Sequence, residues 1–177
     1  MTTGASGGVV WLTGMSGAGK TTVAGLLAGR LRAEHRDPVV LDGDRLRSIL
    51  PVTLGYAPEE RRRSARFYAR LAGDLAGQGH LVICATISLF HEVHAWNRTH
   101  LPRYLEVWLR APLPELRART GRAALYGGID VVGTDIEPEF PLAPDLVIDN
   151  HPPRTAAEAA ERIHEALENR PARTVPR

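Results

Sequence analysis

The sequence predicts an α/β protein built as a three-layer sandwich, in which a five-stranded parallel sheet lies between two layers of helices. Short apolar segments alternate with longer segments of helical periodicity, the order expected of parallel strands joined by helices. Residues 81–87 are apolar almost throughout, as a strand covered on both faces requires. A glycine-rich segment directly follows the first apolar segment and opens a helical pattern, which is typical of a phosphate-binding site.

Length and composition indicate one globular domain. The chain has 177 residues, of which 44% are hydrophobic and 24% charged, and this is enough for one sizeable core. We therefore expect a single domain over residues 1–177, with flexible ends at 1–8 and 169–177. The net charge of +2 comes from scattered arginines, so we expect neither nucleic acid nor a membrane as a partner.

The sequence also bears on compartment and redox chemistry. It contains neither a signal-peptide pattern nor an apolar span of about 18 residues, so we expect a cytoplasmic protein. Cys84 is the only cysteine and cannot form an internal disulfide. Because it lies in an apolar segment, we expect a buried core residue and not a nucleophile.

The segment Gly14-Met15-Ser16-Gly17-Ala18-Gly19-Lys20-Thr21 fits the pattern G-x-x-x-x-G-K-[ST] at every required position. It lies between a predicted strand at residues 9–12 and a predicted helix at 22–34. Glycines let the backbone amides turn inward, and the start of the helix adds unpaired N–H groups and the positive end of a dipole. We expect ATP to contact Gly14, Ser16, Gly17, Ala18, Gly19, Lys20, Thr21 and Thr22.

Two side chains of this segment have specific expected roles. Lys20, the only lysine in the chain, would act as a compact charge on the β- and γ-phosphates. The Thr21 hydroxyl would complete the coordination of a Mg²⁺ ion. ATP and Mg²⁺ are therefore the expected cofactors.

The next elements bring acidic residues to the same edge of the sheet. A short strand at residues 39–41 ends at Asp42-Gly43-Asp44, where ligands collect in open parallel sheets. A helical turn at 45–50 and a loop at 51–56 follow. A longer helix begins at Pro58 and ends before Gly79-His80, and we expect it to bury Phe67, Leu71 and Leu75.

The second half of the chain continues the alternation of strands and helices. Pattern is lost only over residues 121–144, which we expect to form a mobile lid. A final helix begins after Thr155, a favoured N-cap residue. The predicted elements are a strand at 81–87, a helix within 88–100, a strand at 105–109, a helix at 112–119, a strand at 146–148 and a helix at 155–168.

A phosphoryl-transfer site needs a carboxylate for the attacking hydroxyl or for Mg²⁺. The predicted strand ending at Ile87 has none, whereas Asp42 and Asp44 end the strand before it. We interpret Asp42 as the general base toward a substrate hydroxyl. Asp44 would order Mg²⁺-bound water or the substrate. The alternative is an ordinary D-G turn without catalytic function.

Beyond these local patterns, the chain resembles the adenylylsulfate (APS) kinases, which have the P-loop kinase fold and transfer the ATP γ-phosphate to the 3′-hydroxyl of adenylylsulfate. The resemblance covers roughly residues 9–165. It includes the glycine-rich segment, Leu41-Asp42-Gly43-Asp44-x-x-Arg47, Leu54-Gly55-Tyr56 with Glu60-Arg61, Ala85-Thr86-Ile87-Ser88, 107–113, Leu125-Tyr126 and Gly133-x-Asp135.

The resemblance implies roles for further residues. Arg47 and Arg61 would hold the sulfate or phosphate of the acceptor, and Tyr56 would stack on its adenine. Ser64, Ile87 and Ser88 would complete the acceptor site. Arg119 resembles the lid arginine near ATP in P-loop kinases. APS kinases are commonly dimers, so the resemblance allows for a homodimer.

The chain departs from the family pattern on the acceptor side. Ser64 replaces an asparagine, and Leu89 and His91 replace a proline and an arginine. At the usual lid lysine stands Arg122 or Ala123. The segment His91-Glu92-Val93-His94 does not fit a zinc helix motif, because that motif has two residues between the glutamate and the second histidine.

Three functions remain open from the sequence. The first is phosphorylation of adenylylsulfate to 3′-phosphoadenylylsulfate in sulfate assimilation. The second is the same phosphoryl transfer to another anionic nucleotide or metabolite of specialised metabolism. The third is a nucleotide-binding switch without catalysis.

Overall fold

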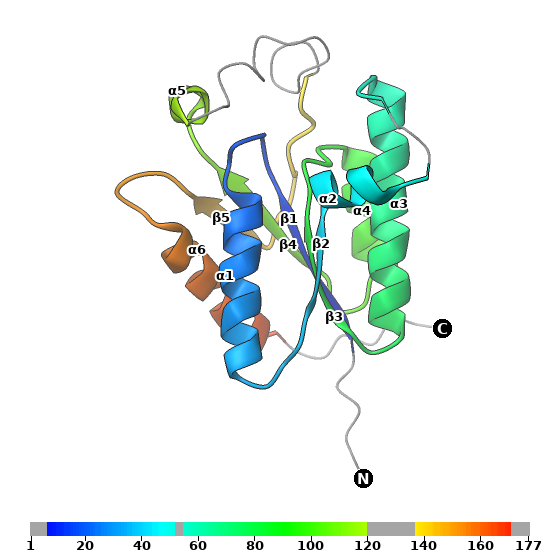
Figure 1. The fold of residues 1–177 in the computed structure, drawn as a ribbon, viewed down its shortest axis with the longest axis vertical. Helices are drawn as coiled ribbons and strands as arrows, with labels where there is room; N and C mark the ends of the chain where they lie inside the picture. Colours follow the sequence, from blue (N-terminus) through cyan, green and yellow to red (C-terminus); the bar gives the residue numbers. More distant parts are fainter. Residues whose placement is uncertain (1–6, 52–54, 120–136, 171–177) are drawn as a thin grey trace.

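The computed structural model describes residues 7–51, 55–119 and 137–170. Five strands form one sheet in the order β2-β3-β1-β4-β5, and every neighbouring pair is parallel (Figure 1). The three-layer sandwich with a five-stranded parallel sheet is therefore confirmed. The strands are β1 Gly8–Thr13, β2 Val39–Asp42, β3 Leu81–Ala85, β4 Leu105–Arg110 and β5 Leu146–Asp149.

Side-chain alternation along β1 divides the interior into two cores. Val10 and Leu12 belong to one apolar cluster, whereas Val9 and Trp11 belong to the other, and all four are fully buried. Because successive side chains of a strand point to opposite faces, a sheet with two apolar faces needs helices on both. The helices are α1 Lys20–Ala33, α2 Gly43–Ile49, α3 Pro58–Gly77, α4 His91–His100, α5 Leu113–Ala118 and α6 Ala156–Glu168.

Helices α1 and α6 cover one face of the sheet. Their buried side chains, such as Leu27, Leu31 and Ile163, pack with Val10 and Leu12 in a single cluster. Helix α6 begins with a capping box, in which the Thr155 hydroxyl accepts from the Glu158 N–H while the Glu158 carboxylate accepts from the Thr155 N–H. The predicted N-cap at Thr155 is therefore confirmed.

Helices α3 and α4 cover the other face (Figure 1). The expectation that α3 buries Phe67 is wrong, since Phe67 is 40% exposed and Leu71 and Leu75 are only partly buried. The buried face of α3 instead contains Tyr68 and the alanines Ala65, Ala69, Ala72 and Ala76. Small side chains let this helix lie close to the sheet. The larger apolar residues then lie at the side of the helix and not against the sheet.

Other boundaries also differ from the predictions. Strand β3 ends at Ala85 and not at residue 87, and the backbone turns soon afterwards, at Ser88, which has a φ of 24°. Gly7 and Gly8 are buried and Gly8 begins β1, so the expected flexible lead-in is wrong there. A Cβ at Gly7 would lie 2.0 Å from the Ala76 carbonyl oxygen, so α3 packs directly on this backbone.

The chain end also contributes to the fold. Arg170 pairs with Asp145 at 3.0 Å, so the expected frayed tail is wrong for residues 169 and 170, whereas 171–177 lie outside the described residues. Of the predicted lid, residues 121–136 lie outside them as well, and 137–144 follow an irregular path. Cys84 is fully buried, as expected, and burial raises the pKa of its thiol.

No helix within the described ranges is both long enough and apolar enough to cross a membrane.

Neighbouring leucines of α1 provide a test of the buried face. Leu27 is fully buried in the core, whereas Leu26 is 43% exposed. We expect Leu27→Ala to lower the free energy of unfolding by about 3 kcal/mol, because it removes apolar contacts and leaves a cavity. Leu26→Ala is the matched control and should cost less than about 1 kcal/mol in the same urea titration. Equal losses for both variants would contradict the assigned orientation of α1.

Candidate active site

A cleft of about 950 Å³ opens at the edge of the sheet where the parallel strands end. Such an edge is the usual ligand site of open α/β sheets. Segments following β1, β2, β3 and β5 line the cleft, together with α3. Its basic residues are Lys20, Arg47, Arg61, Arg119 and Arg154, and its carboxylates are Asp42, Asp44 and Glu137, so the lining favours an anionic ligand.

The glycine-rich loop joins β1 to α1, as predicted. A Cβ at Gly14 would lie 2.3 Å from the Leu109 carbonyl oxygen, so only glycine lets the loop pass this close to β4. Gly19 has a φ of 90°, and a Cβ there would lie 2.4 Å from Asn150 Nδ2. Both glycines are therefore required by close backbone approach and conformation.

The start of α1 is suited to an anion. Its N-cap residue, Gly19, makes no side-chain capping bond, and the first turn contains no acidic residue. The first amides of the helix can therefore bind phosphate oxygens. The Lys20 ammonium donates to the carbonyl oxygens of Gly14 at 2.9 Å and Met15 at 2.8 Å, which holds it across the loop.

All but two of the predicted ATP-binding residues line the cleft. The exceptions are Gly14 and Ala18. Gly14 lies against β4, and Ala18 is fully buried with its carbonyl accepting from Asn150 Nδ2 at 2.8 Å. The residues that do line it are Ser16, Gly17, Gly19, Lys20, Thr21, Thr22 and Arg119.

Asp42, the predicted general base, connects the phosphate-binding loop to the start of α2. Its Oδ2 accepts from the Thr21 hydroxyl at 2.6 Å, and its Oδ1 caps α2 by accepting from the N–H groups of Asp44 and Arg45. Asp44, in the first turn of α2, also lines the cleft. A threonine hydroxyl and two carboxylates are the hard oxygen ligands that Mg²⁺ prefers, so these residues fit that ion.

The predicted acceptor-binding arginines lie together around one aromatic ring. The guanidinium carbons of Arg47 and Arg61 lie 4.8 Å and 5.0 Å from the centroid of the Tyr56 ring. Arg47 donates to the Gly55 carbonyl at 2.9 Å, and Arg61 donates to the Tyr56 carbonyl at 2.6 Å. The structure thus brings two cations and an aromatic surface to one end of the cleft.

The remaining predicted acceptor residues also line this end. Ser64 is 2% exposed, and its hydroxyl donates to the Glu60 carbonyl of its own helix at 3.0 Å. Ile87 and Ser88 follow β3, and the Thr86 and Ser88 hydroxyls lie 2.8 Å apart. The side chain of Ser64 is therefore committed mainly to α3 and to Arg47, which lies 3.5 Å away.

One residue of the cleft, Asn150, was missed by sequence analysis. Asn150, directly after β5, is 5% exposed and contacts the phosphate-binding loop through Ala18. Arg119 donates to the Gly17 carbonyl and, at 2.7 Å, to the Asn150 carbonyl, so these two residues connect β5 to the loop. The only sequence signal for Asn150 is its position after a predicted strand. An uncharged amide at that position does not by itself indicate a binding residue. Its functional partner in this contact, Arg119, was predicted.

Two aromatic residues that line the cleft, Tyr68 and Phe90, were also missed by sequence analysis. Tyr68 on α3 donates to the Gly43 carbonyl at 3.2 Å, and burial raises the pKa of its hydroxyl. Phe90 is 6% exposed, and the Arg62 guanidinium carbon lies 4.7 Å from its ring centroid. No sequence pattern distinguished these two residues from ordinary core aromatics.

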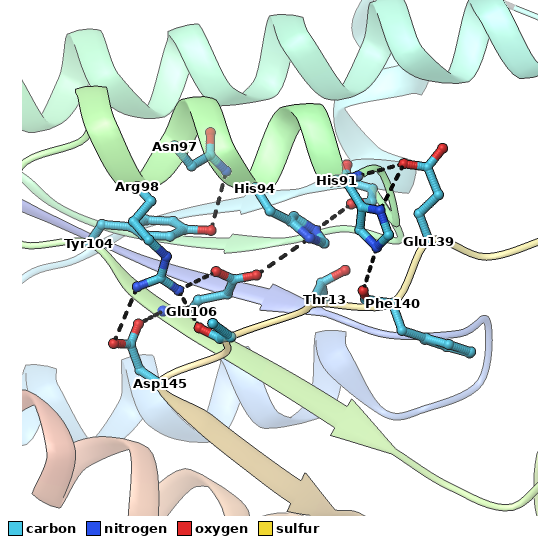
Figure 2. A network of polar contacts seen from close by, with 12 residues as sticks. Thr13, His91, His94, Asn97, Arg98, Tyr104, Glu106, Glu139, Phe140 and Asp145 are labelled. Carbon is cyan, nitrogen blue, oxygen red and sulfur yellow. Dashed lines mark hydrogen bonds and ion pairs between the residues drawn. The ribbon is translucent and has the colours of Figure 1, made fainter.

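The described residues contain no group of three His, Cys, Asp or Glu side chains able to hold a metal ion. The two histidines of the rejected zinc pattern bind different carbonyls. His91 Nε2 lies 2.8 Å from the Phe140 oxygen, and His94 Nε2 lies 2.8 Å from the Ser88 oxygen (Figure 2).

The comparisons with known proteins agree on one protein family. The model of the adenylylsulphate kinase family matches residues 6–149. An adenylyl-sulfate kinase of Paraburkholderia xenovorans is 40% identical over 157 residues, which are 82% of this chain and 84% of that protein. A cytidine diphosphoramidate kinase of Campylobacter jejuni is 38% identical over 164 residues, which are 90% of this chain and 95% of that protein.

Solved structures agree with the sequence comparison. The structure of the Mycobacterium tuberculosis APS kinase in complex with AMPPNP and APS superposes with a TM-score of 0.83 at 32% identity, covering 92% of this chain and 98% of that one. A shikimate kinase of Acinetobacter baumannii, at 18% identity and a TM-score of 0.65, shares the fold.

Substitution of the loop lysine tests whether this loop binds the transferred phosphate. We expect Lys20→Ala to lower kcat by about 10³-fold, because it removes the charge that would meet the β- and γ-phosphates among neutral amides. Release of ADP measures the effect, and circular dichroism controls for folding. If the kcat of Lys20→Ala lay within about fivefold of the wild-type value, the assignment of this loop as the donor site would be wrong.

Proposed function

The chain belongs to the adenylylsulfate kinase family, and on that premise we propose that it transfers the γ-phosphate of ATP to a hydroxyl group of an anionic nucleotide. The observation that carries this proposal is that one cleft contains an open phosphate-binding loop at one end and Arg47, Arg61 and Tyr56 at the other. Two anionic ligands can therefore bind within one cleft, as phosphoryl transfer requires.

On the donor side, the amides of residues 16–22 would bind the phosphates of ATP. Lys20 would move its ammonium from the loop carbonyls to the β- and γ-phosphates. Thr21, with Asp44 through water, would hold Mg²⁺, which when bound neutralises charge that develops on the phosphates. Arg119 already contacts the loop through Gly17 and would add a positive charge beside the nucleotide.

On the acceptor side, we assign Asp42 as the general base and Asp44 as the residue that orders Mg²⁺ through water. Asp42 is suited to the role because capping of α2 and the Thr21 hydroxyl fix its carboxylate at the cleft. Its contact with Thr21 also allows the reverse assignment, in which Asp42 orders the metal. The substitution described below separates the two.

Two acceptors are candidates. Adenylylsulfate is the first, because most of the acceptor-side pattern of the family is present, including Arg47, Tyr56 and Arg61. Cytidine diphosphoramidate is the second, since a kinase named for it is 38% identical across 95% of its own length. Both are nucleotides with an anionic group, which two arginines beside an aromatic ring can bind. A role in sulfate assimilation follows only if the first acceptor is used.

Replacement of the proposed base should affect turnover more than ATP binding. We expect Asp42→Asn to lower kcat by about 10²-fold or more and to leave ATP affinity within a few-fold, because a base acts on the acceptor hydroxyl. Calorimetry with ATP and Mg²⁺ gives the affinity, and Asp44→Asn is the paired variant. Loss of ATP·Mg²⁺ binding together with turnover would make Asp42 the metal-ordering residue and Asp44 the candidate base.

An acceptor panel tests the proposed function itself. We expect ADP release with adenylylsulfate or cytidine diphosphoramidate and none with uncharged alcohols. Arg47→Ala or Arg61→Ala should raise the acceptor KM by about tenfold or more, since each removes a charge-assisted contact. Arg66→Ala is the matched control, because Arg66 pairs with Glu92 and does not line the cleft.

The outcomes of this panel are distinct. Equal use of uncharged alcohols would remove the role given to Arg47 and Arg61. Nucleotide binding without turnover on any acceptor would favour the noncatalytic switch. Preference for one of the two nucleotides would identify the reaction.

A further inference from the structure

Ile87 and Ser88 follow β3 and line the cleft, and we call them the acceptor wall. Two side chains bind the backbone carbonyls of this wall. The Thr13 hydroxyl donates to the Ile87 carbonyl at 2.6 Å, and His94 Nε2 lies 2.8 Å from the Ser88 carbonyl oxygen. Ser88 is 6% exposed, and its φ of 24° is unusual for a residue with a side chain. The His94 ring therefore contacts the backbone of Ser88 at the point where the chain turns.

The two nitrogens of His94 both face oxygen atoms. A carbonyl oxygen only accepts, so Nε2 must carry the proton that is donated to Ser88. In a neutral ring Nδ1 is then a bare acceptor, and it lies 3.4 Å from Glu106 Oε1, which is also an acceptor when ionised. Neither Nδ1 nor Oε1 has a hydrogen-bond partner elsewhere in the described part of the chain.

Burial makes this arrangement costly unless a proton lies between the two atoms. His94 is 6% exposed and Glu106 is 2% exposed, and each buried polar atom left unpaired costs about 1–3 kcal/mol. One additional proton satisfies both atoms at once. It can reside on Glu106, which then donates to Nδ1, or on His94 as an imidazolium.

The charged and titratable groups around the pair come from several elements. Glu106 Oε2 accepts from Arg98 at 2.5 Å, and Arg98 lies 3.6 Å from Asp145. Burial lowers the pKa of His94 to about 4 and raises the pKa of Glu106, and both directions favour a neutral ring beside a protonated carboxyl group. The other neighbours are His91 on α4, Glu139 in the segment before β5, and Tyr104 before β4.

We propose that His94 and Glu106 share one proton and that this buried pair positions Ser88 at the acceptor wall of the cleft. His94 is thus a positioning residue, since it acts on the acceptor through the Ser88 carbonyl. The assignment of the wall to an acceptor rests on the proposed function, whereas the shared proton does not.

Loss of the shared proton should weaken the acceptor site. Without it, either the ring keeps its proton on Nε2 and two lone pairs face each other, or the proton moves to Nδ1 and the Ser88 carbonyl loses its donor. The proton is bound at low pH and lost as pH rises. We therefore expect the kcat/KM for the acceptor to fall as pH rises through the pair's pKa, while the KM for ATP changes little.

NMR of the full chain with ¹⁵N-labelled histidines tests the pair without any need for turnover. We expect His94 to keep its Nε2 proton near neutral pH, with Nδ1 showing the shift of a nitrogen that accepts a strong hydrogen bond or is protonated. His94→Leu identifies the resonance by its loss. A bare Nδ1 whose shift is unchanged in Glu106→Gln would overturn the proposal, whatever the enzyme phosphorylates.

Kinetics test the positioning role with the same variants. In Glu106→Gln the amide oxygen can accept from Arg98 while its N–H donates permanently to His94 Nδ1. This variant should keep acceptor kcat/KM at high pH, so its ratio to wild type should rise as the pH rises through the pair's pKa. Because both enzymes use the same substrates, the ionisations of ATP and of the acceptor cancel in the ratio of variant to wild type. A ratio that does not change with pH would contradict the positioning role.

Two further variants complete the set. His94→Leu removes the donor to Ser88 and should lower acceptor kcat/KM by about five- to tenfold, with the KM for ATP within about twofold. His100→Gln, on the exposed part of the same helix, is the matched control and should retain the wild-type pH profile. If His94→Leu does not fold, the comparison of Glu106→Gln with wild type still decides the proposal.

Discussion

The close contact between the phosphate-binding loop and the ends of β4 and β5 is the constraint on which the site depends. The loop backbone passes so near Leu109 that Gly14 has no room for a Cβ, and the Asn150 side chain fills the space beside Gly19. Asn150 and Arg119 then bind the carbonyls of Ala18 and Gly17. Because these carbonyls are held by the scaffold, the loop amides can remain directed toward the cleft.

The two ends of the cleft are held in different ways. The donor end is fixed by backbone geometry and the start of α1, which are common to many phosphate sites. The proposed acceptor end is built from side chains, with Arg47 and Arg61 bound to carbonyls around Tyr56 and with His94 bound to the Ser88 carbonyl. Side-chain walls can change with few substitutions, so related chains can keep the same donor chemistry and use different acceptors.

A polar cluster joins α4 to β4 and to the segment before β5 (Figure 2). Glu106 on β4 contacts both His94 and Arg98 of α4, and Asp145 accepts from the Glu106 N–H at 2.7 Å. A cluster of this kind adds little net stability, because desolvation offsets much of the attraction. Its contacts do join α4 to β4, and removal of one member would leave its partner buried and unpaired.

The sequence by itself determined the parallel α/β fold, the family and the donor loop. These follow from local spacing, since one run of glycines with Lys20 and Thr21 between a strand and a helix suffices. The tertiary structure alone decided which face α3 buries, because the residues it packs on the sheet are mostly small alanines, while the large Phe67 lies on the exposed side. It also decided the contacts of Asn150, Ser64, His94 and Glu106. Asn150 lies 132 residues from Ala18, and such contacts exist only once the sheet has assembled.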